Sequence, residues 1–183
     1  MGAVARAVCA AAGRLEDRAL ARRFETLRAL PDGTLGREYI HYLETRGWPL
    51  PGERGAQSDI IVYHDMTHIL ADYGTDPGGE VETACFTAGH RRKEPFTFVL
   101  FVLLQFHIGV RMTPGAKAER GYFDVGRALV ALERGAAMNI DLSADWDYWD
   151  VVDVSVDELR RRYNIPPRMA PRPALLVDRK AEE

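Results

Sequence analysis

Two histidines and a glutamate, separated by a helix-breaking turn, constrain this chain more than any other feature. His64 and His68 stand four residues apart, so on a helix they lie one turn apart on the same face. Residues 73–79, Tyr-Gly-Thr-Asp-Pro-Gly-Gly, then end that helix. Asp76 is a good N-cap for a second helix that begins with proline and carries Glu80 in its first turn. The pattern predicts two helices folded against each other, with these three side chains between them.

The residue types in this pattern are those of a divalent metal site. Asp65 follows His64 directly and, at ~100° per residue, projects into the same arc of the helix as His68. Imidazole nitrogens combined with carboxylate oxygens favour Zn²⁺ and also suit Fe²⁺, Mn²⁺ or Co²⁺. We predict His64, Asp65, His68 and Glu80 as metal ligands, with Asp65 and Glu80 also serving as catalytic carboxylates. The spacing leaves open whether Asp65 binds the metal directly or turns aside, as a base or as a partner of a ligand.

Other interpretations of the motif compete with this one. A plain helix with polar core histidines and solvated acids would have the same sequence. A zinc metalloprotease is disfavoured because Asp65 stands where that motif has its catalytic glutamate. A phosphohydrolase built on an adjacent His-Asp pair would need a further histidine and a further aspartate, for which His41 and Asp124 are available. Asp72 is a candidate partner of a ligand, against simple solvation at a helix end.

The motif also resembles the signature of the Coq4 family of ubiquinone-biosynthesis proteins. The shared elements are His64-Asp-x-x-His68-(x11)-Glu80 with Tyr73-Gly-Thr-Asp76 between them. Weaker similarities flank this centre, and the resemblance as a whole covers about residues 14–165. The flanking segments are Pro31-Asp-Gly-Thr-Leu-Gly36 with Tyr39, then Trp146 to Trp149, then Val156-Asp-Glu-Leu-Arg-Arg161.

The resemblance implies a fold, a metal and a substrate class. It implies an all-helical protein that binds a metal through the motif and holds a polyprenyl lipid in a hydrophobic tunnel. It implies a homodimer that lies peripherally on the membrane together with other quinone-biosynthesis proteins. The implied activity is metal-dependent oxidative decarboxylation and hydroxylation of a polyprenylated benzoate-type quinone precursor. The alternative is a non-catalytic, metal-stabilised lipid-binding scaffold that organises quinone-biosynthesis enzymes.

Length and composition agree with a single all-α domain. The chain has 183 residues, 46% of them apolar, which is enough for one core. Its net charge of −3 argues against a nucleic-acid partner. Two cysteines give no disulfide framework, and Cys85 is expected to be a small buried residue. We expect an N-terminal extension over 1–13, a helical domain over 14–165 and a proline-rich tail over 166–183, in a cytoplasmic protein associated peripherally with the inner membrane.

Hydrophobic periodicity and capping residues predict where the helices lie. Residues 96–110 form an almost wholly apolar run, expected as a helix that lies in the bundle core or lines the tunnel; a buried strand is the alternative. His107 in this run is a candidate fifth ligand, although a core histidine is the simpler expectation. Gln105 and Arg111 could contact a polar head group, although structural or solvated positions are the simpler expectation. The predicted helices span 14–30, 34–46 with Thr34 as N-cap, 58–72 with Ser58 as N-cap, 80–92, 96–110, 113–134 and 155–163 with Ser155 in a capping box.

Overall fold

The computed structural model describes residues 16–56, 59–113, 116–144 and 146–168. These residues form seven α-helices and two short 3-10 helices, and they contain no β-sheet, only two isolated bridges. The all-α prediction is therefore confirmed for the described part of the chain. The α-helices are α2 (Arg18–Glu25), α3 (Leu35–Glu44), α4 (Asp59–Ala71), α5 (Pro77–His90), α6 (Thr97–Phe106), α7 (Val125–Ala136) and α8 (Val156–Arg162); the 3-10 helices are η1 (Thr26–Ala29) and η2 (Tyr148–Asp150).

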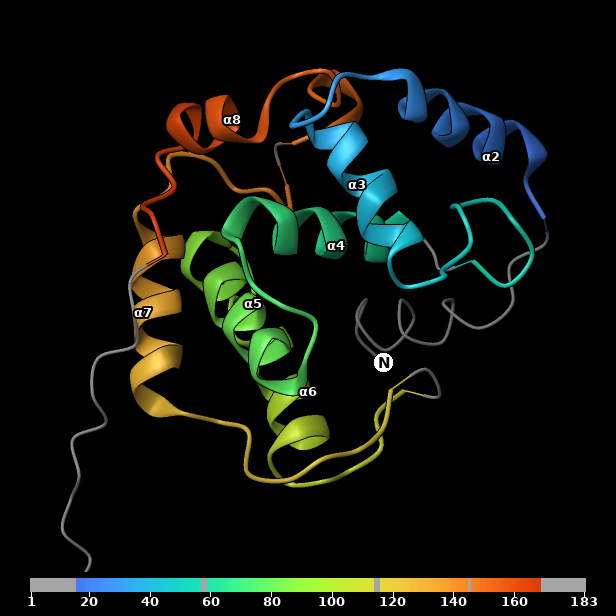
Figure 1. Ribbon diagram of the computed structural model, residues 1–183. Coiled ribbons are helices and arrows are strands. Elements are labelled where there is room, and N and C mark those ends of the chain that lie inside the picture. Colours follow the sequence, from blue (N-terminus) through green and yellow to red (C-terminus); the bar gives the residue numbers. More distant parts are fainter. Residues whose placement is uncertain (1–15, 57–58, 114–115, 145, 169–183) are drawn as a thin grey trace, which may run out of the picture.

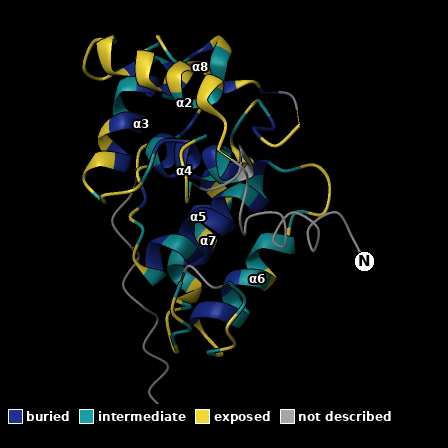
Figure 2. Cartoon of the chain, turned by 90° about the vertical axis from the view of Figure 1, so that its right-hand side faces the viewer, coloured by how far each residue is buried: buried dark blue, intermediate teal, exposed yellow. Residues whose placement is uncertain are grey.

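The helices are arranged around α4. Figure 1 shows α4 lying across the middle of the molecule, with α5, α6 and α7 on one side and α2, α3 and α8 on the other. The helices differ in how far they are buried: α5 is largely buried, whereas α2 exposes most of its surface (Figure 2). The two helices that the motif predicted, α4 and α5, therefore lie at the centre of the fold.

Two glycines allow α5 and α7 to pack closely. A Cβ atom at Gly135 of α7 would overlap the carbonyl oxygen of Phe86, and one at Gly89 of α5 would overlap that of Leu132. Ala131, on the face of α7 that meets α5, is completely buried. Small residues on both helices thus bring the two backbones into direct contact, and this fixes the position of α5.

An aromatic cluster fills the other half of the core. Phe24 is fully buried and its ring centroid lies 4.8 Å from that of Trp149 and 5.7 Å from that of Tyr39. Trp146 is buried and donates its indole N–H to the Tyr163 hydroxyl at 3.0 Å. Trp146 and Trp149 both belong to this cluster, and they lie on either side of the start of η2.

Several predicted helix starts are confirmed. The Asp76 side chain accepts hydrogen bonds from the amides of Gly78 and Gly79, and Ser155 accepts one from the amide of Glu158. Thr34 is the N-cap residue of α3, but its hydroxyl donates to the Pro31 carbonyl instead of capping the helix. The predicted N-cap Ser58 lies outside the described residues.

The apolar run is a helix, but it is shorter than predicted and the next helix starts later. α6 ends at Phe106, and the helix predicted over 113–134 is wrong in its first half because α7 begins only at Val125. The buried Gln105 holds the intervening loop, since its side-chain amide donates to the carbonyls of Ala116 and Lys117 and accepts from the Met112 amide. Its structural role is confirmed. None of the described helices has both the length and the apolar character needed to span a bilayer.

A buried histidine at the end of α5 makes stability depend on pH. The His90 ring has no hydrogen-bond partner among the described residues, and its Nδ1 lies 3.6 Å from Asp141 Oδ1. Burial lowers the pKa of His90 from 6.5 to about 4. The negative charge of Asp141 acts in the opposite direction and raises this pKa, whereas the positive charge of Arg91 lowers it further. The folded state therefore favours the neutral ring.

We expect the free energy of unfolding to be fully retained above pH 6.5 and to fall by up to about 3 kcal/mol as the pH drops towards 4. Stability falls with decreasing pH because the unfolded chain takes up a proton on His90 between pH 6.5 and 4 and the folded chain does not. Urea unfolding at several pH values measures the slope. His90→Leu should flatten it, whereas His107→Leu, a change at an exposed histidine, should not; equal slopes in both variants would contradict the assignment.

Candidate metal centre

Three of the four predicted ligands converge between α4 and α5. His64 and His68 project from α4, and Glu80 projects from the first turn of α5. His64 Nε2 lies 3.0 Å from His68 Nε2 and 3.0 Å from Glu80 Oε2, while His68 Nε2 lies 3.5 Å from Glu80 Oε1. One potential ligand atom from each residue lies within 4.8 Å of the other two. The predicted convergence of these residues is therefore present, in a geometry that a single cation can share.

The site is buried on one side and reachable from solvent on the other. The His68 side chain is only 1% exposed, whereas His64 and Glu80 keep 26% and 22% of their side-chain surface. Burial by itself would raise the pKa of Glu80, but hydrogen bonds from both histidines outweigh it and hold this pKa at about 2. Burial would lower the pKa of His64, and Glu80 raises it on balance. The glutamate is thus held ionised, which suits a cation.

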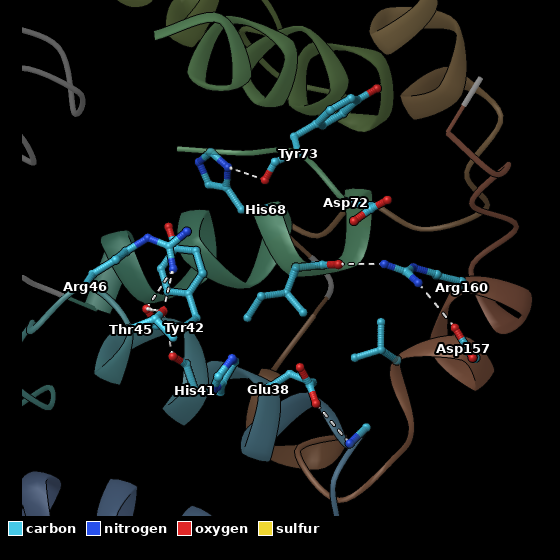
Figure 3. Close-up of a pocket in the computed structure, with 13 residues that line it drawn as sticks. Glu38, His41, Tyr42, Thr45, Arg46, His68, Asp72, Tyr73, Asp157 and Arg160 are labelled. Carbon is cyan, nitrogen blue, oxygen red and sulfur yellow. Dashed lines mark hydrogen bonds and ion pairs between the residues drawn. The ribbon is translucent and has the colours of Figure 1, made fainter. Parts of the chain in front are cut away.

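Two oxygen atoms contact the ring nitrogen of His68 that lies away from the cluster, and they orient the ring. Its Nδ1 lies 3.0 Å from the hydroxyl oxygen of Thr83. It also lies 3.3 Å from the carbonyl oxygen of Tyr73, as Figure 3 shows. When a metal is bound, an Nδ1–H donated to these oxygens would leave the lone pair of Nε2 for the metal. The sequence interpretation missed both partners, although Thr83 stands one helical turn after Glu80 and the spacing would have allowed it to be found.

Asp65 does not belong to the group that the other three residues form. Its carboxylate is buried and accepts a hydrogen bond of 3.2 Å from the hydroxyl of Tyr42, which lies on α3. Burial raises the pKa of Asp65 to about 7, against the opposing effects of His64 and Tyr42. Among the described residues the ligand-type group contains only the two histidines and Glu80. The role of Asp65, as a direct ligand or as a residue that turns aside, stays a prediction.

The remaining sequence candidates lie elsewhere. His107 is exposed and accepts a 3.4 Å hydrogen bond from the Phe123 amide, and His41 is exposed on α3. Asp124 caps α7 through the Arg127 amide, so the described residues do not assemble the His-Asp phosphohydrolase set. Cys85 is buried, and burial raises the pKa of its thiol to about 11, as expected for a structural residue. Arg111 is exposed in the loop after α6.

Arginines from the last third of the described chain cap the C-terminal end of α4. Arg160 of α8 donates to the carbonyls of Ile69 and Leu70, and the buried Arg134 of α7 donates to that of Ala71. The next carbonyl, that of Asp72, accepts a hydrogen bond from Arg168. The Asp72 side chain itself is exposed at the helix end. Cations at a helix C-terminus are favourable, and these bonds satisfy carbonyls that have no partner within the helix.

A polar cleft of about 440 Å³ reaches His68 from the side of α3 and α8. Figure 3 shows Tyr42 from α3, Arg46 from the turn after it, Arg160 from α8 and Tyr73 around this cleft. A second, smaller cavity of about 90 Å³ borders Asp65 and is lined mainly by apolar side chains and prolines. Neither space establishes the hydrophobic lipid tunnel, which stays a prediction from the family resemblance.

The chain is similar to a described crystal structure and matches no family model. No family model matches the chain, and no curated protein matches it significantly. Among solved structures, the chain is similar to a crystal structure described as a "Putative ubiquinone biosynthesis protein" from Nostoc punctiforme PCC 73102. The two share 21% sequence identity, with a TM-score of 0.49, over 79% of this chain and 68% of that chain.

Proposed function

We propose that this chain is a Coq4-like, divalent-metal-dependent enzyme of quinone biosynthesis. Its substrate would be a polyprenylated benzoate-type precursor whose ring carboxyl is replaced by a hydroxyl. The observation that carries the proposal is the convergence of His64, His68 and Glu80, which stand in the motif that resembles the Coq4 signature. The metal ligands, the ring substrate and the reaction are all parts of this proposal.

The residues present fit a divalent metal. Two imidazole nitrogens and a carboxylate give three protein ligands, the number found in catalytic zinc sites that keep a position open. The donor set favours Zn²⁺ and also suits Fe²⁺, Mn²⁺ or Co²⁺. When bound, the metal would supply a positive charge that stabilises a phenolate or carboxylate oxygen of the ring. The partial exposure of His64 and Glu80 leaves that side of the site open to a substrate.

The proposed reaction balances with dioxygen and water as co-reactants. The carbon–carbon bond between ring and carboxyl breaks and the carboxyl leaves as CO₂, while water supplies the oxygen of the new hydroxyl. Dioxygen accepts two electrons and two protons and leaves as hydrogen peroxide. Asp65, a buried carboxyl next to His64, is the candidate acceptor for the proton that water releases.

The test is turnover by the metal-loaded protein. We would supply dioxygen and a prenylated 4-hydroxybenzoate-type acid carrying a methoxy group, and use mass spectrometry to look for exchange of carboxyl for hydroxyl. Product that forms with metal and disappears after chelation would support the proposal, and H₂¹⁸O should label the new hydroxyl. Tight retention of the lipid without product would favour the scaffold alternative, in which the chain, as a homodimer, presents quinone intermediates to other biosynthesis proteins.

The proposal includes contact with a membrane surface, and α6 offers an apolar face for it. Phe96 and Leu100, one turn apart, are 61% and 59% exposed, and Ile108 and Val110 directly after the helix are also exposed. These four residues are called the α6 patch. Residues 91–125 hold six basic and three acidic side chains, a net charge of +3 in a chain whose total is −3. Basic residues around exposed apolar side chains suit anionic lipid.

Leu100→Ser should lower binding to vesicles that contain anionic lipid by about threefold or more, because it removes one large apolar contact. Co-sedimentation with vesicles of mixed anionic and neutral lipid measures this. Val125→Ser, a change at a comparably exposed residue on α7, is the matched control and should bind normally. Equal loss in both variants, or no binding by the unaltered protein, would contradict the α6 patch as the contact surface.

A further inference from the structure

Tyr42 links α3 to the candidate metal centre without being one of its ligands. Its side chain is buried, and its ring centroid lies 6.3 Å from that of His68. Its hydroxyl donates to Asp65 Oδ1 at 3.2 Å. The Arg46 guanidinium lies 3.8 Å above the Tyr42 ring, on the side of the polar cleft (Figure 3). The phenol is therefore fixed in one orientation by contacts on both its ring and its hydroxyl.

Asp65 depends on this hydroxyl. The residue is 5% exposed, and the Tyr42 phenol is the hydrogen-bond donor that the described residues offer to its carboxylate. A buried carboxylate without a donor is costly, so it would turn towards another positive partner if the phenol were absent. Because Asp65 directly follows His64 in sequence, a cation held by His64, His68 and Glu80 would be a partner close at hand.

We propose that Tyr42 is a positioning residue that holds the Asp65 carboxylate out of the metal's ligand set. The inference rests on the proposed metal site and adds to it. With Asp65 tied to Tyr42, the protein supplies three ligands, and the remaining coordination positions stay free for substrate oxygen and water. The carboxylate then stays beside the metal as a proton acceptor instead of being consumed as a fourth ligand.

The chain provides a matched control on the same helix. Tyr39 stands one turn before Tyr42, is 1% exposed, and its ring stacks on that of Tyr42 at 6.4 Å between centroids. Among the described residues, its hydroxyl makes no hydrogen bond to Asp65. Tyr39→Phe and Tyr42→Phe both remove one buried hydroxyl from the same layer of the core. Only the second of them removes the donor to Asp65.

The experiment is a titration of the full-length, metal-free protein with Co²⁺, followed by visible absorption. Four-coordinate Co²⁺ absorbs strongly in the visible range and its absorption weakens as coordination number rises, so the spectrum reports the ligand set. In Tyr42→Phe we expect the position and intensity of the visible bands to change and Co²⁺ to bind about three- to tenfold more tightly, because Asp65 joins the ligands. Tyr39→Phe should match the unaltered protein, and Asp65→Asn in the Tyr42→Phe background should restore the original spectrum.

The outcomes separate this inference from the proposed function. If the unaltered protein binds no Co²⁺, the metal site itself is refuted and the inference with it. If it binds Co²⁺ and folded Tyr42→Phe gives an unchanged spectrum and affinity, only the role of Tyr42 is refuted. Equal changes in Tyr39→Phe and Tyr42→Phe would show a general disturbance of the core and would also overturn the proposal. Circular dichroism and thermal unfolding check that each variant is folded.

Discussion

His68→Ala should abolish metal binding and turnover while the protein stays folded. The imidazole is the most buried of the three converging side chains, and Thr83 and Tyr73 hold it in place, so alanine removes a pre-oriented ligand. We expect affinity for Zn²⁺ or Co²⁺ to fall by more than about 100-fold, since losing even a residue that orients a ligand costs 10- to 100-fold. Isothermal titration with the metal gives the affinity, and mass spectrometry of the quinone precursor gives the turnover.

His41→Ala is the control for this substitution. His41 lies on α3, is exposed, and belongs to no metal-ligand group among the described residues. It lines the polar cleft but offers no ligand atom to the cluster, so His41→Ala should leave metal affinity within about twofold of the unaltered value. Full turnover in folded His68→Ala would refute catalysis at the proposed centre. Robust phosphatase activity on nucleotides would instead revive the His-Asp phosphohydrolase interpretation.

Gly135→Ala should be among the most destabilising single substitutions in the chain. The added methyl group would overlap the Phe86 carbonyl oxygen at the contact between α7 and α5, and neither backbone can move without displacing a helix. Alanine has the better helix propensity, by about 1 kcal/mol, but overpacking against backbone outweighs that gain. We expect a net loss of about 2–3 kcal/mol in the free energy of unfolding, measured by urea denaturation.

The neighbouring Ala136→Ser tests whether the effect is local to the contact. Ala136 is exposed on α7, so the added hydroxyl meets solvent and should change the free energy of unfolding by no more than about 0.5 kcal/mol. A Gly135→Ala protein as stable as the unaltered one would mean that α5 and α7 are not packed backbone to backbone. Because Glu80 is carried by α5, Gly135→Ala should also weaken metal binding even where the protein remains folded.

Local sequence signals predicted the centre of the molecule well. The spacing of His64 and His68, and the Asp76 cap followed by proline, depend only on the geometry of single helices, and both are present in the structure. The helix predicted over 113–134 was wrong because Gln105 organises the loop through contacts 7 to 12 residues away in sequence. Asp124, which does cap α7, was the available signal for the true helix start.

The surroundings of the site could not be predicted from spacing. Asp65 falls in the right arc of α4, yet its carboxylate is hydrogen-bonded to Tyr42, which lies 23 residues earlier and on another helix. The carbonyl partner of His68 depends on how the chain turns at Tyr73, where α4 has already ended. Helix periodicity places a side chain on a face, whereas the rotamer that it adopts there depends on tertiary neighbours.

The arginine caps on α4 have a consequence for the order of events during synthesis. The donors to Ala71, Leu70, Ile69 and Asp72 stand 63, 90, 91 and 96 residues further along the chain. When the histidines leave the ribosome, the groups that secure the end of their helix have not yet been translated. Contacts of such long sequence separation slow folding. The nascent chain should therefore acquire a rigid ligand cluster only after Arg160 and Arg168 have been translated, and a protein released early at about residue 150 would carry the whole motif without these two caps.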